Sequence, residues 1–116
     1  MKRVGVLGEN LAEKFLQKSG YEIIERNYRF GHLEIDIIAR KDRVISFVEV
    51  KTRKSLSFGK GEEAVNERKQ NHLRKVAEHF IATHEINESV DFRFDIIVIE
   101  ISRNSTWIRM IENAFY

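Results

Sequence analysis

Two acidic motifs, Glu34-Ile35-Asp36 and Glu49-Val50-Lys51, lie on segments in which apolar and polar residues alternate as in β-strands. Because side chains alternate along a strand, Glu34 and Asp36 share one face, and so do Glu49 and Lys51. If the two strands pair through the turn at 41–43, Asp36 and Glu49 lie across from each other near the open end of the hairpin, and the register decides whether they share a face. Two neighbouring carboxylates repel each other, and a divalent cation between them relieves that repulsion. The pattern therefore indicates an all-oxygen magnesium or manganese site.

Lys51 gives this pair of strands a possible reaction. Beside a metal ion, its ammonium group could orient or deprotonate a water molecule and neutralise charge on a phosphate oxygen. Together these are the parts of phosphodiester hydrolysis. The alternative interpretation is an exposed charge pair at a strand end.

The sequence lacks the residues that several other common enzyme chemistries require. Gly59-Lys60-Gly61 has neither the leading glycine nor the Ser/Thr of a phosphate-binding loop, and no serine lies in a glycine elbow. The four histidines offer no zinc-protease pair and are interpreted as surface or rim residues. The absence of cysteine excludes disulfides, thiolate zinc sites and cysteine nucleophiles.

Positive charge is concentrated in one part of the chain. The net charge is only +2, but the segment 40–60 carries seven basic residues against two acidic ones. A local excess of this kind is typical of a surface that binds a polyanion such as nucleic acid, and it is also typical of a solvated basic loop.

Hydrophobic periodicity predicts the elements that must position these residues. An amphipathic helix follows from the apolar residues Val4, Leu7, Leu11, Phe15 and Leu16, and Gly20 can end it. The remaining pattern predicts three strands, a long helix and two more strands, over Tyr21–Phe30, Leu33–Arg40, Val44–Arg53, Glu62–Thr83, Phe92–Ile101 and Trp107–Ile111. This order favours an α/β fold with a mixed central sheet flanked by helices.

The length and composition agree with a single folded unit. A chain of 116 residues with 42% hydrophobic and 33% charged residues can bury one core, so we expect one domain over 1–116. No apolar run is long enough to span a membrane, and the apolar start is interrupted by Glu9. We therefore expect no membrane partner and a cytoplasmic location.

Several blocks in order along the chain resemble the YraN-type family of small bacterial endonuclease-like proteins, within the PD-(D/E)xK nuclease superfamily. One departure is Leu33, where that family usually has glycine before the Glu-Ile-Asp run. The matching blocks are Gly8-Glu9 with Ala12, Gly20-Tyr21, Asn27-Tyr28-Arg29, Glu34-Ile35-Asp36, Phe47-Val48-Glu49-Val50-Lys51-Thr52-Arg53, Lys69, Arg93-Phe94-Asp95 and Asn113-Ala114-Phe115.

The resemblance implies a restriction-endonuclease-like core, similar to that of archaeal Holliday-junction resolvases. It implies magnesium (or manganese) at Asp36 and Glu49, with the carbonyl of Val50 as a further ligand and Lys51 as the catalytic lysine. Glu9 would complete the site from the first helix, where a charge complementing the helix dipole is the alternative role.

The resemblance also bears on residues outside the carboxylate pair. Lys69 and Gln70 would approach the site or the backbone phosphates, unless they are simply solvated helix residues. Arg53, Lys54 and Lys60 are candidate phosphate contacts. A structural pair is the preferred interpretation of Arg93 and Asp95.

Two hypotheses of function remain open at this point. The leading one is a magnesium-dependent endonuclease acting on DNA, with branched or structured DNA as the substrate and a homodimer as the assembly that the resemblance suggests. The rival is a non-catalytic module that binds nucleic acid or docks to a partner on the same nuclease-like fold.

Overall fold

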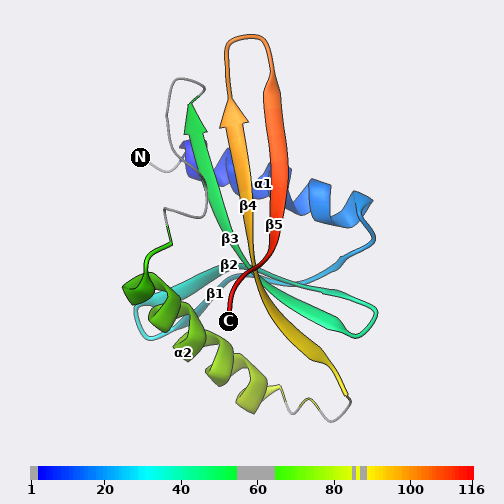
Figure 1. Cartoon of the computed structure of the whole chain (residues 1–116), viewed down its shortest axis with the longest axis vertical. Coiled ribbons are helices and arrows are strands. Elements are labelled where there is room, and N and C mark those ends of the chain that lie inside the picture. The colour runs from blue at the N-terminus through cyan, green and yellow to red at the C-terminus, as the bar shows by residue number, and fades with distance from the viewer. Residues whose placement is uncertain (1–2, 55–64, 85, 87–88) are drawn as a thin grey trace.

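The computed structural model describes residues 3–54, 65–84, 86 and 89–116, which form a five-stranded sheet with a helix on each face (Figure 1). The predicted order of helix, three strands, helix and two strands is confirmed, and with it the mixed α/β fold. The elements are α1 (Arg3–Lys18), β1 (Glu22–Phe30), β2 (Leu33–Lys41), β3 (Val44–Lys54), α2 (Glu67–Thr83), β4 (Asp91–Ile101) and β5 (Thr106–Phe115).

The strands lie side by side in sequence order, β1-β2-β3-β4-β5, and one pair among them is parallel. Strands β1, β2 and β3 are antiparallel neighbours, as are β4 and β5, whereas β3 and β4 run in parallel. A parallel pair needs a long crossover connection, and α2 lies in the one between β3 and β4. The predicted tight turn after β2 is confirmed, with Asp42 at a φ of 54°.

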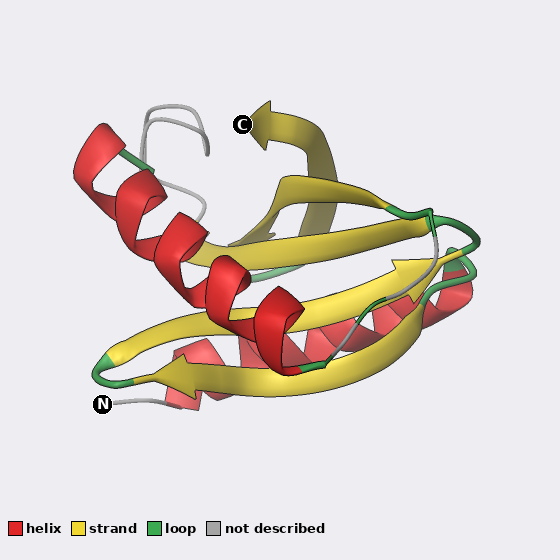
Figure 2. Cartoon of the chain, turned by 90° about the horizontal axis from the view of Figure 1, so that it is seen from below, coloured by secondary structure: helices red, strands yellow, loops and turns green. Residues whose placement is uncertain are grey.

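Two apolar cores lie on the two faces of the sheet. On β4, Ile96 and Val98 pack in the core that contains α2, while Ile97 and Ile99 pack in the core that contains α1. In Figure 2 the two helices lie on opposite sides of the strands. A strand that is buried on both faces reads as a continuous apolar run, which explains the pattern of the segment 96–99.

Helix α1 lies closer to β3 than a helix with larger side chains could. Ala12 and Leu16 are fully buried, but Leu7, which the apolar pattern placed in the same stripe, is 48% exposed. The contact at this end is made by Gly8 instead, because a Cβ on Gly8 would overlap Oγ1 of Thr52 on β3. The helix ends at Lys18, and Gly20, the glycine predicted to end it, lies in the turn that follows with a φ of 95°.

Two predicted boundaries differ from the structure by more than one residue. The pattern predicts that the long helix begins at Glu62, but it begins at Glu67. Asn66 caps it, because its side-chain oxygen accepts a hydrogen bond from the backbone N–H of Lys69 (2.9 Å). Residues 62–64 lie outside the described part. Strand β5 is longer than Trp107–Ile111, because it pairs with β4 as far as Phe115. Among the described residues, no helix is long and apolar enough to cross a membrane.

Candidate active site

The two acidic motifs meet where β2 separates from β3. The last ladder pair toward the open end of this hairpin is Ile37 with Val48, so Asp36 follows opposite Glu49. One residue further along β3, the backbone N–H of Val50 donates to Oδ2 of Asp36 at 2.8 Å. A carboxylate thus takes the place of a backbone carbonyl at the end of the ladder, and the two acidic strands are held together there.

A change in the path of β2 accompanies this separation. Ile35 packs in the core with α2, whereas Ile37, only two residues later, packs in the core with α1. On the neighbouring strand, Asn27 lies between the pairs Arg26–Ile37 and Tyr28–Ile35 and has a φ of 53°. Simple alternation of faces therefore fails at the level of Asp36, because both strands are locally distorted.

The environment of Asp36 disfavours its charged form. Burial, and then the negative charge of Glu49, raise the pKa of Asp36 to about 7, with a smaller contribution from Glu9. The hydrogen bond from Val50 and the positive charge of Lys69 oppose this increase in the pKa. At neutral pH this carboxyl group is therefore poised between its two protonation states.

Glu49 is buried between two lysines and still lacks a partner for one oxygen. Its side chain is 6% exposed, and Oε2 lies 3.4 Å from Nζ of Lys51 and 3.6 Å from Nζ of Lys69. Oε1 is buried and accepts no hydrogen bond from any residue in the described part of the chain. Burying a carboxylate oxygen without a hydrogen-bond donor raises the free energy of the folded state, and a cation bound at Oε1 would remove that cost.

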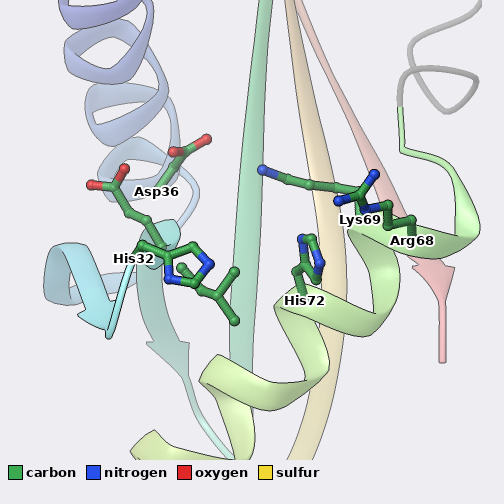
Figure 3. A pocket seen from close by; sticks show the side chains of 7 residues that line it. His32, Asp36, Arg68, Lys69 and His72 are labelled. Carbon is green, nitrogen blue, oxygen red and sulfur yellow. The ribbon is translucent and has the colours of Figure 1, made fainter.

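Lys69 and Gln70 are adjacent in sequence but differ in their contacts. Lys69 extends from α2 toward the acidic strands, and Figure 3 shows its side chain directed to Asp36. The side-chain amide of Gln70 instead donates to the carbonyl of Val65 (3.0 Å) and accepts from Arg74 (3.3 Å). The structure therefore brings Lys69 to the carboxylates and places Gln70 in contacts that fix the start of α2.

Glu9 lies near the pair but is already engaged. Its Oε1 accepts hydrogen bonds from Arg26 (3.2 Å) and from the side-chain amide of Asn27 (3.1 Å). Its charge still contributes to the raised pKa of Asp36. The first helix thus adds a third carboxylate to the electrostatics of the site, through a side chain that β1 holds in place.

The three candidate phosphate contacts have different surroundings. Arg53 is partly buried, and its Nε lies 3.7 Å from Glu100 on β4. Lys54 is exposed at the end of β3. Lys60 lies outside the described residues.

A pocket of about 370 Å³ opens beside Asp36 and Lys69 (Figure 3). Of its other lining residues, Glu34 belongs to the first acidic motif and Leu33 directly precedes that motif, whereas His32, Arg68 and His72 were not predicted to be part of a site. Helical spacing could have suggested His72, which follows Lys69 by three residues and so lies on the same side of α2. The pocket is lined by His32, Leu33, Glu34, Asp36, Arg68, Lys69 and His72.

Arg93 and Asp95 form a buried network away from the acidic pair. Asp95 accepts two bonds from Nε of Arg93 at 2.9 Å, one from the backbone N–H of Asn113 at 2.9 Å and one from the hydroxyl of Ser46. These contacts join β3, β4 and β5. They agree with the interpretation of a structural pair.

The donor set of the acidic pair fits a hard divalent cation. Within the described part of the chain, no three or more His, Cys, Asp or Glu side chains converge closely enough to hold a metal ion by themselves. Magnesium, however, is usually held by one or two carboxylates and keeps several waters or phosphate oxygens as its other ligands. Asp36 and Glu49 supply two such carboxylates, and Oε1 of Glu49, which accepts no hydrogen bond from the described residues, is available as a ligand atom.

Comparison with known proteins gives consistent matches over nearly the complete chain. Residues 8–99 match the model of "Uncharacterised protein family UPF0102". A UPF0102 protein of Caldicellulosiruptor bescii is 53% identical over 99% of this chain and 98% of its own, and one of Alkaliphilus metalliredigens is 48% identical over 98% of both chains. Among solved structures, Pyrococcus furiosus SfsA in complex with Ca²⁺ matches with a TM-score of 0.34 and 14% identity, over 93% of this chain and 62% of that chain.

Proposed function

This chain belongs to the UPF0102 family, the YraN-type family that its motifs resemble, and we propose that it is a magnesium-dependent endonuclease that hydrolyses phosphodiester bonds in DNA. The observation that carries the proposal is the buried carboxylate of Glu49 beside Asp36. One of its oxygens lies between two lysines, and the other has no hydrogen-bond donor among the residues that the structure describes. A buried carboxylate oxygen without a hydrogen-bond donor, next to a second carboxylate, raises the free energy of the folded chain. A bound divalent cation would offset this cost better than a further ammonium group, because it neutralises both carboxylates.

Asp36 and Glu49 would hold the ion, which manganese could replace. The carbonyl of Val50 and Oε2 of Glu9 are further oxygen donors, since Oε1 of Glu9 is used by β1. When bound, such a cation supplies charge stabilisation at phosphorus and lowers the pKa of a coordinated water.

The lysines of the site act on the phosphate and the attacking water. Lys51 shares its strand face with Glu49, and its Nζ would donate to a phosphate oxygen and orient the water. Nζ of Lys69 approaches the same carboxylate from α2 and adds positive charge on the pocket side. The water attacks phosphorus in line with the leaving oxygen, so that a P–O bond to the water forms as the P–O bond to the leaving oxygen breaks. The attacking water gives its proton to bulk water, and the leaving oxygen takes up a proton from another solvent water.

The partner and setting are part of the same proposal. The basic strand end at Arg53 and Lys54, together with Lys60, would contact the backbone of DNA and make binding depend on salt. Branched or structured DNA and a homodimeric assembly follow from the family resemblance, and a cytoplasmic location remains the expectation from the sequence pattern.

Cleavage of a labelled branched DNA with magnesium or manganese tests the proposal. We expect Asp36→Ala, Glu49→Ala and Lys51→Ala each to lose at least about a hundredfold in rate while DNA binding is retained. Lys75→Ala, which removes an exposed lysine of α2, is the matched control and should cut as the unmodified chain does. Equal cleavage by all of these proteins would contradict the proposal.

One observation favours the rival function, a module that binds nucleic acid without cutting it. The charge of Glu49 is already flanked by Lys51 and Lys69, so the pair can exist without a metal ion. This alternative predicts salt-dependent DNA binding, no effect of magnesium on that binding and no product in the cleavage assay.

A further inference from the structure

An exposed aromatic stack lies beside the pocket and has no part in the chemistry proposed above. The rings of Phe30, at the end of β1, and His79, on α2, are stacked with centroids 4.3 Å apart and an angle of 15° between their planes. Phe30 is 43% exposed although it is a large apolar side chain. The imidazole of His79 stacks against the ring of Phe30, and much of the Phe30 side chain remains exposed to solvent.

Other contacts hold the stack in place. Nδ1 of His79 lies 2.8 Å from the hydroxyl of Tyr28, and the ring of Tyr28 meets Phe80 edge to face at 5.3 Å. Phe80 belongs to the buried core. The imidazole that supports Phe30 is therefore fixed from the core outward, so an aromatic surface is offered with little conformational entropy left to lose on binding.

The stack and the pocket are neighbours on two sides. Phe30 pairs directly with Leu33, which lines the pocket, and residues opposite each other in an antiparallel pair project to the same face. On α2, His79 follows the pocket residue His72 by seven positions, which is two helical turns on the same side and about 10 Å along the axis. A chain molecule that enters the pocket would thus reach the stack within a short distance.

The pocket supplies the charge that such a chain molecule would need. Arg68 and Lys69 lie on its α2 side, and His32 and His72 add two imidazoles (Figure 3). The acidic residue Glu34 on the other side is paired with Arg29 at 3.6 Å. Phosphate groups and a planar base are the two chemical features that a cationic pocket beside an aromatic surface recognises together.

We propose that the site takes a nucleic acid with an unpaired segment, one base of which stacks on the exposed face of Phe30 while the adjoining phosphates occupy the pocket. This inference rests on the proposed function and specifies its substrate: the bond to be cut would lie next to a single-stranded stretch. A base inside a duplex has both faces covered by its neighbours, so intact duplex cannot use this surface.

Binding without metal separates this inference from the question of cleavage. We would measure the fluorescence anisotropy of a labelled ten-nucleotide oligothymidylate and of a blunt duplex of equal length, in buffer containing a chelator. Phe30→Ala should weaken binding of the single strand about tenfold and leave duplex binding unchanged. The slope of log affinity against log salt should not change, because no phosphate contact is removed.

Two further variants control for shape and for general loss of apolar surface. Phe30→Tyr keeps an aromatic face and should bind the single strand as the unmodified chain does. Trp107→Ala removes a residue of β5 that is 70% exposed, and it should bind both oligonucleotides normally. Thermal unfolding of each variant shows whether the fold is intact, and Phe30→Leu serves as the second variant if the alanine change lowers the unfolding temperature.

A direct signature of stacking is the quenching of 2-aminopurine placed within the oligothymidylate. We expect quenching on binding to the unmodified chain and to Phe30→Tyr, and its loss in Phe30→Ala. Single-strand affinity that is the same in Phe30→Ala, equal losses for single strand and duplex, or no binding of the single strand by the unmodified chain would each overturn the inference. A protein that binds in this way but never cuts would contradict the proposed function alone.

Discussion

A buried carboxylate, Glu49, and a half-buried one, Asp36, define the candidate site and have different surroundings. Glu49 has two ammonium groups near Oε2, whereas the carboxylate of Asp36 accepts one backbone N–H and has its pKa raised by burial. This asymmetry suits a metal site, because a bound cation favours the charged form of Asp36.

The raised pKa of Asp36 makes the stability of the metal-free protein depend on pH. Its pKa is about 7 in the folded chain against an ordinary value of 3.8, so the folded chain holds a proton that the unfolded chain has released. The stabilisation is complete below about pH 4 and is lost as the pH rises through 7. We expect Asp36→Asn to remove this dependence and to be more stable at pH 8 by roughly 2 kcal/mol.

Urea unfolding between pH 4 and pH 8, in a chelating buffer, checks that difference. Glu22→Gln, which neutralises an exposed carboxylate at the start of β1, is the control and should retain the pH dependence of the unmodified chain. If the free energies of unfolding of Asp36→Asn and the unmodified chain remained parallel across this range, the environment assigned to Asp36 would be wrong.

Strand alternation and the turn at 41–43 were enough to predict that Asp36 lies across from Glu49 and that Lys51 shares a face with Glu49, but they left open whether Asp36 shares that face. The pocket residues His32, Arg68 and His72 were not predicted, because they meet only when α2 packs beside the β1–β2 turn. Such contacts depend on tertiary packing, which leaves no period in the sequence. That Oε1 of Glu49 accepts no hydrogen bond from the described residues is likewise a result of packing, and no sequence pattern indicates it.

Among the helices and strands, the approach of α1 to β3 is the contact most sensitive to a single methyl group. A Cβ on Gly8 would overlap Oγ1 of Thr52 and lie 3.1 Å from its Cβ. We expect Gly8→Ala to lower the free energy of unfolding by about 1–3 kcal/mol, because the helix must move outward. Glu9, the next residue, would move with it.

Chemical denaturation of two alanine variants on the same helix isolates this effect. No atom of the described residues lies within 4 Å of the position that a Cβ on Gly5 would take, so Gly5→Ala should be neutral or stabilise the protein by about 0.5–1 kcal/mol through helix propensity. Similar effects of both substitutions would show that Gly8 is not a close contact. A Gly8→Ala/Thr52→Ala double variant should recover part of the loss.

The network around Asp95 ties β4 to its two neighbouring strands. Asp95→Ala would leave Arg93 partly buried without its carboxylate, and we expect a loss of about 3–5 kcal/mol in the free energy of unfolding. Glu100→Gln disrupts the longer and more exposed pair with Arg53 and should cost less than about 1 kcal/mol. Comparable losses in the two variants would contradict the structural role assigned to Asp95.

The order of elements along the complete chain could be predicted because helix and strand periods differ clearly from one another. The parallel pairing of β3 with β4 could not be read from that order, since it depends on where α2 crosses the sheet. The change of faces in β2 between Ile35 and Ile37 is also invisible to a period of two. That local change is what lets β2 leave β3 at the candidate site.

The fold as a unit therefore brings three elements to one point: β2 supplies Asp36, β3 supplies Glu49 and Lys51, and α2 supplies Lys69. Calorimetric titration of manganese into the unmodified chain and into Glu49→Gln tests most directly whether this point is a metal site. The account predicts saturable binding to the unmodified chain, tighter at pH 8 than at pH 6, and at least about a tenfold loss in Glu49→Gln. Equal heats and affinities for the two proteins, or no heat from either, would contradict it.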